Sequence, residues 1–226
     1  MTANPNPVLV GIIAGLVTAI LMAAAGYASL FAIVLTIAAM ISVFIAGLGF
    51  GIASCLIAIA VAAGSTALLY SNPMSFVAMT LLLLPVAVMS YLANLARPAT
   101  EIGGPNTAMA WYPLSDILLA GAVVTAVGTI VTLMIQPDLG AVYATLADMI
   151  IAMMREIDPP MPVDADTRVK IIGFFELLFP LMQSLQLMMA LFAGFYFAMR
   201  ILTASGRSLR PREDIRSSLR MNRLSI

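Results

Sequence analysis

The sequence predicts an all-α protein, a polytopic integral membrane bundle of six transmembrane helices plus one outer amphipathic helix. Two observations carry this prediction. The first is composition: 62% of the 226 residues are apolar and 10% are charged, whereas about 25% of the residues of a soluble domain are charged. The second is that no charged residue precedes Arg97. So long an uncharged stretch cannot coat a water-soluble surface, and it indicates several membrane spans.

The spans follow from length and from turn residues. A helix needs about 20 apolar residues to cross the hydrocarbon core. The apolar run over 8–50 is too long for one span, so we divide it at 26–29, and the glycines up to Gly51 predict the next reversal. Ser71-Asn72-Pro73 is a turn signal, and Pro85 predicts a kink. We expect spans at about 8–25, 30–48, 51–70, 74–96, 114–135 and 171–200, in a transmembrane domain over 1–202 with a basic tail over 203–226.

Residues 139–157 form a segment of another kind. Apolar residues recur there at helical spacing, and Asp148, Arg155 and Glu156 make a full crossing expensive. We expect an interfacial or re-entrant amphipathic helix on the outer face. It either packs against the bundle as a cap or forms a lid over an outward-facing cavity. The predicted apolar stripe consists of Leu139, Val142, Leu146, Met149 or Ile150, Met153 and Ile157.

Basic residues predict the orientation. From Arg200 onward seven Arg stand against Glu213 and Asp214, a net charge of +5, whereas 97–199 has a net charge of −5. The positive-inside rule then places the C-terminus in the cytoplasm, and six spans place the N-terminus there too. The expected location is a bacterial-type inner (plasma) membrane. The tail arginines from Arg207 to Arg223 are expected to contact anionic lipid, and the tail lacks the interleaved aromatics that would favour nucleic acid.

Composition removes several kinds of chemistry. The chain has no His, one Cys (Cys55) and one Lys (Lys170). It therefore offers no imidazole base, no thiolate cluster and no Walker A site. We expect no enzymatic activity, no metal site and no cofactor.

Polar residues within the spans are the candidate substrate-binding groups. Thr125, Thr129, Thr132 and Gln136 share one face of the fifth span. They are either packing residues whose hydroxyls bond their own helix, or the polar wall of a solute cavity. In the sixth span the candidates are Glu176, Gln183 and Gln186. Glu176 is placed either in the lipid or at the outer interface.

Two further sets of residues have alternative interpretations. Gly11, Gly15, Ala19 and Ala23 recur every four residues and allow close approach of another helix, either within the chain or from a partner protein. The loop after the fourth span contains Arg97, Trp111 and Asp116. It is either a hairpin with an interfacial anchor and a helix cap, or a gating element in which Arg97 pairs with Asp116 or Glu101.

The chain resembles the YybS-like predicted membrane proteins. The resemblance rests on Ala96-Arg97 near the end of span four, on Trp111-Tyr112-Pro113 at the start of span five and on the basic tail. That family is in turn similar to the S components of energy-coupling-factor transporters. These have six spans and meet a partner through small residues on span one, a spacing that Ala19 and Ala23 match. The resemblance implies a fold and no settled function.

The expected function is a transport component that binds a small apolar or neutral solute and has no ATPase of its own. The solute would lie between spans five and six, under the 139–157 helix. The alternative is a non-catalytic scaffold or accessory subunit of a membrane-envelope complex, which would use the ladder of Gly11 to Ala23 as its interface.

Overall fold

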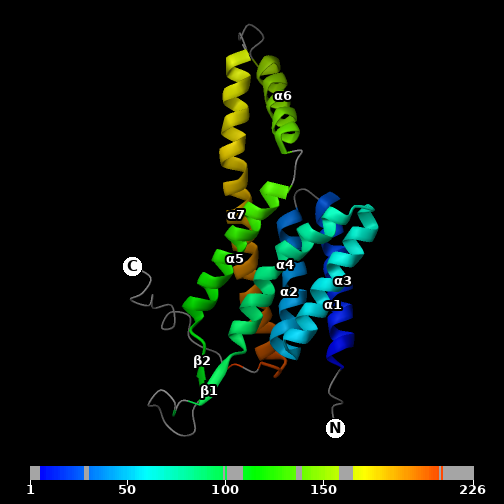
Figure 1. Cartoon of the computed structure of the whole chain (residues 1–226), viewed down its shortest axis with the longest axis vertical. Coiled ribbons are helices and arrows are strands. Elements are labelled where there is room, and N and C mark those ends of the chain that lie inside the picture. Colours follow the sequence, from blue (N-terminus) through cyan, green and yellow to red (C-terminus); the bar gives the residue numbers. More distant parts are fainter. Residues whose placement is uncertain are drawn as a thin grey trace.

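The structure is a computed structural model that describes residues 6–27, 31–98, 100, 109–135, 139–157, 165–208 and 210. Its architecture is a helical bundle with one short β-hairpin (Figure 1). Six helices are long and apolar enough to cross a membrane, which confirms the predicted fold class. They are α1 (Pro7–Tyr27), α2 (Ala32–Phe50), α3 (Ile52–Tyr70), α4 (Pro73–Ala93), α5 (Leu114–Ile135) and α7 (Ala165–Ala204).

The first reversals occur where the turn residues predict them. Gly51 is the single residue between α2 and α3, and its φ of 93° and ψ of 170° lie in a region that essentially only glycine adopts. At the next turn the Asn72 side chain accepts a hydrogen bond of 2.9 Å from the backbone N–H of Met74, and Pro73 starts α4. This is a helix N-cap followed by proline at the first helical position.

The fourth helix ends earlier than predicted. It stops at Ala93, and Ala96–Pro98 forms a strand, β1, that pairs antiparallel with β2 (Met109–Trp111). Pro98 contributes to this end of the helix, because proline disfavours the helical conformation at the residue before it and has no N–H to pair with the Asn94 carbonyl in a longer helix. Asn94 closes the helix and donates a hydrogen bond of 2.9 Å from Nδ2 to the carbonyl oxygen of Gly47 on α2.

The small-residue ladder on α1 packs inside the chain. A Cβ atom on Gly11 would lie 2.7 Å from the carbonyl oxygen of Ser54, and one on Gly15 would lie 2.6 Å from that of Ala58. The two glycines therefore let α1 and α3 approach at backbone contact, with Ala19 buried beyond them and Ala23 half-buried. This packing is the internal alternative. Gly11 and Gly15 are therefore not free to form the partner interface that the scaffold hypothesis requires.

The core is built mainly from α2, α3, α4 and α7. Phe44 and Leu83 are fully buried, and the Phe44 ring meets Phe195 edge to face at 5.5 Å between centroids. Large apolar side chains also cover the outside of the bundle, as lipid contact requires. On α1 and α5 these are Leu9, Ile13, Ile20, Leu119, Val123, Val127 and Ile130.

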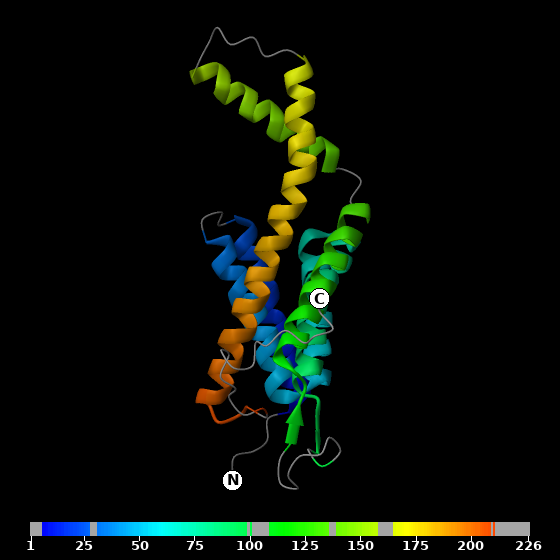
Figure 2. The ribbon, with the colours of Figure 1, turned by 90° about the vertical axis from the view of Figure 1, so that its left-hand side faces the viewer.

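The last helix is longer than the predicted span. Helix α7 has 40 residues and remains helical through Pro180. At 1.5 Å per residue it is about 60 Å long, twice the thickness of the hydrocarbon core. Its N-terminal half extends beyond the other spans, beside α6 (Leu139–Ile157), in both Figure 1 and Figure 2.

Helix α6 has the predicted bounds, but the predicted stripe faces the wrong way. The residues buried against α7 are Tyr143, Ala147 and Ile151, whereas Met149 and Met153 are both 60% exposed. The small Ala147 allows α6 to approach α7 closely, and the Tyr143 ring meets Phe179 at 5.8 Å. The shape of the contact, rather than the size of the apolar side chains, selects the buried face.

An ion pair also joins α6 to α7. The Arg168 guanidinium donates hydrogen bonds of 2.7 and 2.9 Å to the two carboxylate oxygens of Asp148. These hydrogen bonds hold the pKa of Asp148 below its ordinary value of 3.8. Because the pKa is lowered, the ion pair stabilises the α6–α7 contact at pH values above 3.8. This stabilisation is lost as the pH falls through the lowered pKa of Asp148.

We therefore expect acid to loosen the α6–α7 contact. Spin labels on Thr145→Cys and Gly173→Cys should report one distance from neutral pH down to about pH 4, and a broader distribution below. Because exposed ion pairs contribute little, the change should be partial. Asp148→Asn should show the broader distribution already at neutral pH. Asp166→Asn is the control, because Asp166 pairs with Lys170 inside α7. A distribution that Asp148→Asn leaves unaltered would contradict the assignment.

Candidate functional site

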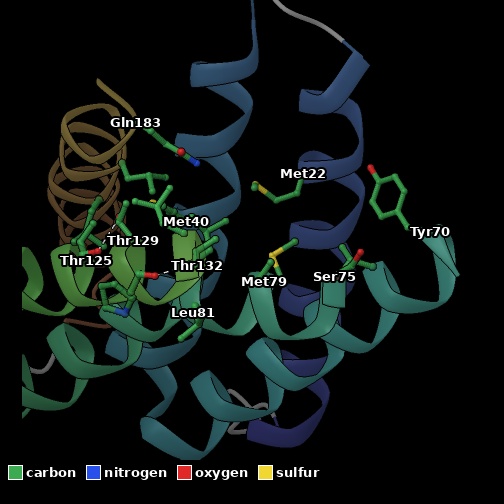
Figure 3. A pocket seen from close by; sticks show the side chains of 18 residues that line it. Met22, Met40, Tyr70, Ser75, Met79, Leu81, Thr125, Thr129, Thr132 and Gln183 are labelled. Atoms are coloured by element: carbon green, nitrogen blue, oxygen red, sulfur yellow. Dashed lines mark hydrogen bonds between the residues drawn. The ribbon is translucent and has the colours of Figure 1, made fainter. Parts of the chain in front are cut away.

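A pocket lies in the half of the bundle nearer to α6. The course of the chain shows this. The second halves of α1, α3 and α5 and the first half of α4 lie at that end of the bundle, and they supply most of the lining residues of these helices. The cavity has a volume of about 320 Å³, within the range of small-molecule sites. All six spans contribute to the wall, with α4 and α5 providing most of it (Figure 3). The lining residues are Met22, Met40, Thr66, Tyr70, Ser75, Ala78, Met79, Leu81, Leu82, Pro85, Thr125, Gly128, Thr129, Thr132, Leu133, Gln183, Leu187 and Leu191.

Most of this wall is apolar and adaptable. Met22, Met40 and Met79 reach the cavity from three different helices, as Figure 3 shows. Methionine is unbranched and polarisable, so it can fit ligands of differing shape. None of the 18 residues that line the pocket carries a charge at neutral pH. The cavity is therefore suited to a neutral or apolar molecule rather than to an ion.

The threonine face of α5 forms one side of the pocket. Thr125 and Thr129 are buried, and Thr132 lies one turn further on. Each hydroxyl donates to a carbonyl four residues earlier: to Gly121 at 2.8 Å, to Thr125 at 2.9 Å and to Gly128 at 2.8 Å. Both alternatives for this face therefore apply, because the hydroxyls bond their own helix and also line a cavity.

The residues predicted on the sixth span are separated by the structure. Gln183 lines the pocket (Figure 3), whereas Glu176 and Gln186 do not. Glu176 is exposed and lies two turns before Gln183, in the direction of the protruding half of α7. Gln183 and Gln186 are exposed as well, so position relative to the pocket, and not burial, distinguishes the three residues. Residues three apart in an α-helix are separated by about 60° around the helix axis, so Gln183 and Gln186 are neighbours on the helix surface and only Gln183 reaches the edge of the pocket.

The pocket also differs from its expected position. We expected a solute between spans five and six, under the amphipathic helix. The cavity instead extends from α5 and α7 to α1, α2, α3 and α4, and α6 supplies none of its 18 lining residues. Helix α6 lies beside the protruding part of α7 (Figure 2) and so does not form the lid of this cavity.

The predicted loop residues lie at the opposite end of the bundle. Arg97 is exposed on β1, opposite Ala110 of β2, and Trp111 is half-buried. Asp116 is in the first turn of α5 and accepts a hydrogen bond of 3.3 Å from the Ser115 hydroxyl. In the described part of the chain Arg97 forms no ion pair with Asp116, and Glu101 lies outside the described residues. The paired strands fit the hairpin of the first alternative, whereas the Ser115–Asp116 bond joins two side chains and does not cap the helix backbone.

The start of the tail turns back onto the bundle. Gly206, at a φ of 68°, ends α7, and the backbone N–H groups of Gly206 and Arg207 donate to the carbonyls of Thr203 and Leu202. This is a Schellman motif, which glycine favours. It places the Arg207 guanidinium 5.2 Å from the centre of the Phe50 ring. Arg210 is buried, and the remaining tail arginines lie outside the described residues.

Several pocket residues were not predicted from the sequence. Met22, Met40 and Met79 carry no signal in an apolar helix, because methionine occurs throughout the spans. Thr66, Tyr70 and Ser75 flank the turn at Ser71-Asn72-Pro73, where polar residues are expected for other reasons. Leu81 and Pro85 could have been found from the sequence. A proline inside a helix has no N–H, so the carbonyl four residues earlier, here that of Leu81, lacks its usual donor.

The fold and the pocket together define the class: a polytopic α-helical membrane protein with a cavity inside its bundle. Comparisons with protein-family models, curated proteins and solved structures find no match for this chain. The resemblance to YybS-like proteins and to S components of energy-coupling-factor transporters therefore stays a prediction.

Proposed function

We propose that the protein binds a small neutral or apolar solute in the membrane as a component of a transport system. The observation that carries the proposal is the cavity of about 320 Å³. Buried Thr125 and Thr129 and the amide of Gln183 meet there in an otherwise apolar wall. A few convergent polar groups in an apolar pocket are what orients a small ligand.

The proposed role is binding, without ATP hydrolysis by this chain. The chain carries no Walker A sequence, so a partner protein would supply ATP hydrolysis if the transport system uses ATP. The spacing of small residues on α1 does not itself define that partner's surface, because Gly11 and Gly15 contact α3.

A comparison of two glutamines on α7 tests the proposal. Protein purified gently from its own membrane should retain a small molecule that native mass spectrometry detects. Gln183→Leu should weaken retention about two- to tenfold, since a neutral hydrogen bond contributes about 0.5–1.5 kcal/mol. Gln186→Leu is the matched control, three residues away and outside the pocket. Purified protein that holds only bulk lipid, or equal effects of the two variants, would contradict the proposal.

We also propose that the β-hairpin end of the bundle faces the cytoplasm. This end holds Arg97 on β1, and Arg200 and Arg207 at the end of α7, whereas α6 lies at the other end (Figure 1). The positive-inside rule favours this orientation. A fluorescent protein fused after residue 208 should fluoresce in the cytoplasm. Periplasmic alkaline phosphatase should be active when inserted after residue 157 and inactive after residue 208. The reverse pattern would overturn the orientation.

A further inference from the structure

Four of the hydroxyl groups that line the pocket already donate their proton to a backbone carbonyl. Thr125, Thr129 and Thr132 each donate to their own helix at 2.8 to 2.9 Å. Thr66, on the opposite side, donates to the carbonyls of Ala62 and Ala63 at 3.0 and 2.9 Å. A hydroxyl has one proton and two acceptor lone pairs. These four side chains can therefore offer the cavity only acceptor oxygens.

A backbone carbonyl adds to the same wall. In a regular helix the N–H of residue 85 would pair with the carbonyl of Leu81, but proline at 85 has no N–H. The carbonyl oxygen of Leu81 lies 3.4 Å from where a Cβ atom on Gly128 would be. Leu81, Pro85 and Gly128 all line the cavity. The Leu81 carbonyl oxygen, which Pro85 leaves without its helical donor, therefore lies close to α5 at Gly128, one residue before Thr129.

The donors of the pocket are located elsewhere. Tyr70 and Ser75 come from the α3–α4 turn and lie on the far side of the cavity from Thr125 and Thr129 (Figure 3). Beside the α5 wall only the Gln183 amide offers an N–H group. Acceptors therefore predominate where α4 faces α5, and no lining residue is charged. An anion placed there would meet oxygen lone pairs and no compensating charge.

We propose that the ligand is a neutral molecule with an apolar body and at least one N–H or O–H donor, bound by the oxygens of Thr125, Thr129 and Leu81. This inference rests on the proposed function and specifies its ligand class. The donor is satisfied by the acceptor wall, and the apolar body lies against the methionines and leucines. A ligand in which a methyl group replaces the donor hydrogen leaves the acceptor oxygens of the wall unpaired. Its complex is therefore weaker.

A pair of matched probes tests the inference. Indole has an apolar body and one N–H, and in 1-methylindole a methyl group replaces the hydrogen of that N–H. Binding to the full chain in lipid nanodiscs is measured for both by competition with a fluorescent displacement probe. We expect indole to bind about two- to tenfold more tightly than 1-methylindole, the effect of one neutral hydrogen bond. Benzyl alcohol and benzyl methyl ether should differ in the same direction.

Variants localise the effect. The double variant Thr125→Val and Thr129→Val should lower the indole to 1-methylindole affinity ratio, because only the Leu81 carbonyl remains of the three proposed acceptors, whereas Thr125→Ser and Thr129→Ser should keep it. Thr203→Val is the control, because Thr203 makes the same bond to its own helix at 2.8 Å but lies outside the pocket. The comparison of the probe pairs on wild-type protein tests the ligand class by itself. The proposal therefore stays testable if a variant misfolds.

The outcomes separate the two proposals. Equal binding of both members of each probe pair would overturn the donor inference and leave the pocket as a binding site. Tighter binding of the methylated members, or of benzoate, would overturn it too. If none of the probes binds and the purified protein retains no solute, both the proposed function and this inference are wrong.

Discussion

Gly15→Leu should destabilise the bundle strongly, because it forces α1 away from α3. Any Cβ atom at this position would lie 2.6 Å from the Ala58 carbonyl oxygen and 2.7 Å from the Val61 Cβ. Both belong to the backbone or to the root of a side chain on α3, so rotamer changes cannot relieve the overlap. The helices must separate, which forfeits the contact of α1 with α3. We expect a loss of about 3 kcal/mol, the upper end of overpacking costs.

The measurement is a thermal unfolding curve of detergent-solubilised protein, followed by fluorescence-detected size exclusion. Gly26→Leu is the matched control on the same helix, because only the Tyr70 hydroxyl lies near its Cβ position, at 3.7 Å. A Gly15→Leu protein with the transition temperature of the control would show that α1 does not pack on α3 in this way.

Gly128→Phe should abolish solute retention while the bundle stays folded. Gly128 is buried and lines the pocket, and a Cβ atom there meets only the Leu81 carbonyl oxygen, at 3.4 Å. The benzyl group would therefore extend into the cavity and occupy space that the solute needs. We expect at least a tenfold fall in retained ligand, because a ligand cannot share a filled site.

The control for this variant is Gly64→Phe on α3, where nothing lies within 4 Å of the Cβ position. Both variants are compared by the amount of small molecule released per mole of folded protein. Full retention by Gly128→Phe would place the bound solute somewhere other than this pocket.

Much of the fold could be predicted because the bilayer limits what a chain can do. Backbone groups in lipid must pair within the chain, so each apolar run of about 20 residues becomes a helix. Turn residues then located the reversals at Gly51 and at Ser71-Asn72-Pro73 within a residue or two. The bounds of α6 followed from the helical spacing of its apolar residues. Helix α4 was predicted too long because apolar residues before Arg97 are compatible with a strand as well as a span.

The faces of the helices could be predicted less well. Periodicity identified the threonine stripe of α5, which does line the cavity, because polar groups in lipid have few other places to lie. It selected the wrong stripe on α6, since Tyr143, Ala147 and Ile151 are buried in place of Met149 and Met153. Where both faces are apolar, hydrophobicity alone cannot choose between them, and complementarity of shape decides.

By itself the sequence determined the class of protein and the number of candidate spans, because these depend on composition and length. Only the tertiary structure decided which polar residues meet. It placed Gln183 in the cavity and left Glu176 and Gln186 outside it, and it turned the Leu81 carbonyl toward Gly128. Such meetings depend on the rotation of each helix about its axis, which is set by close contacts such as that of Gly15 with Ala58.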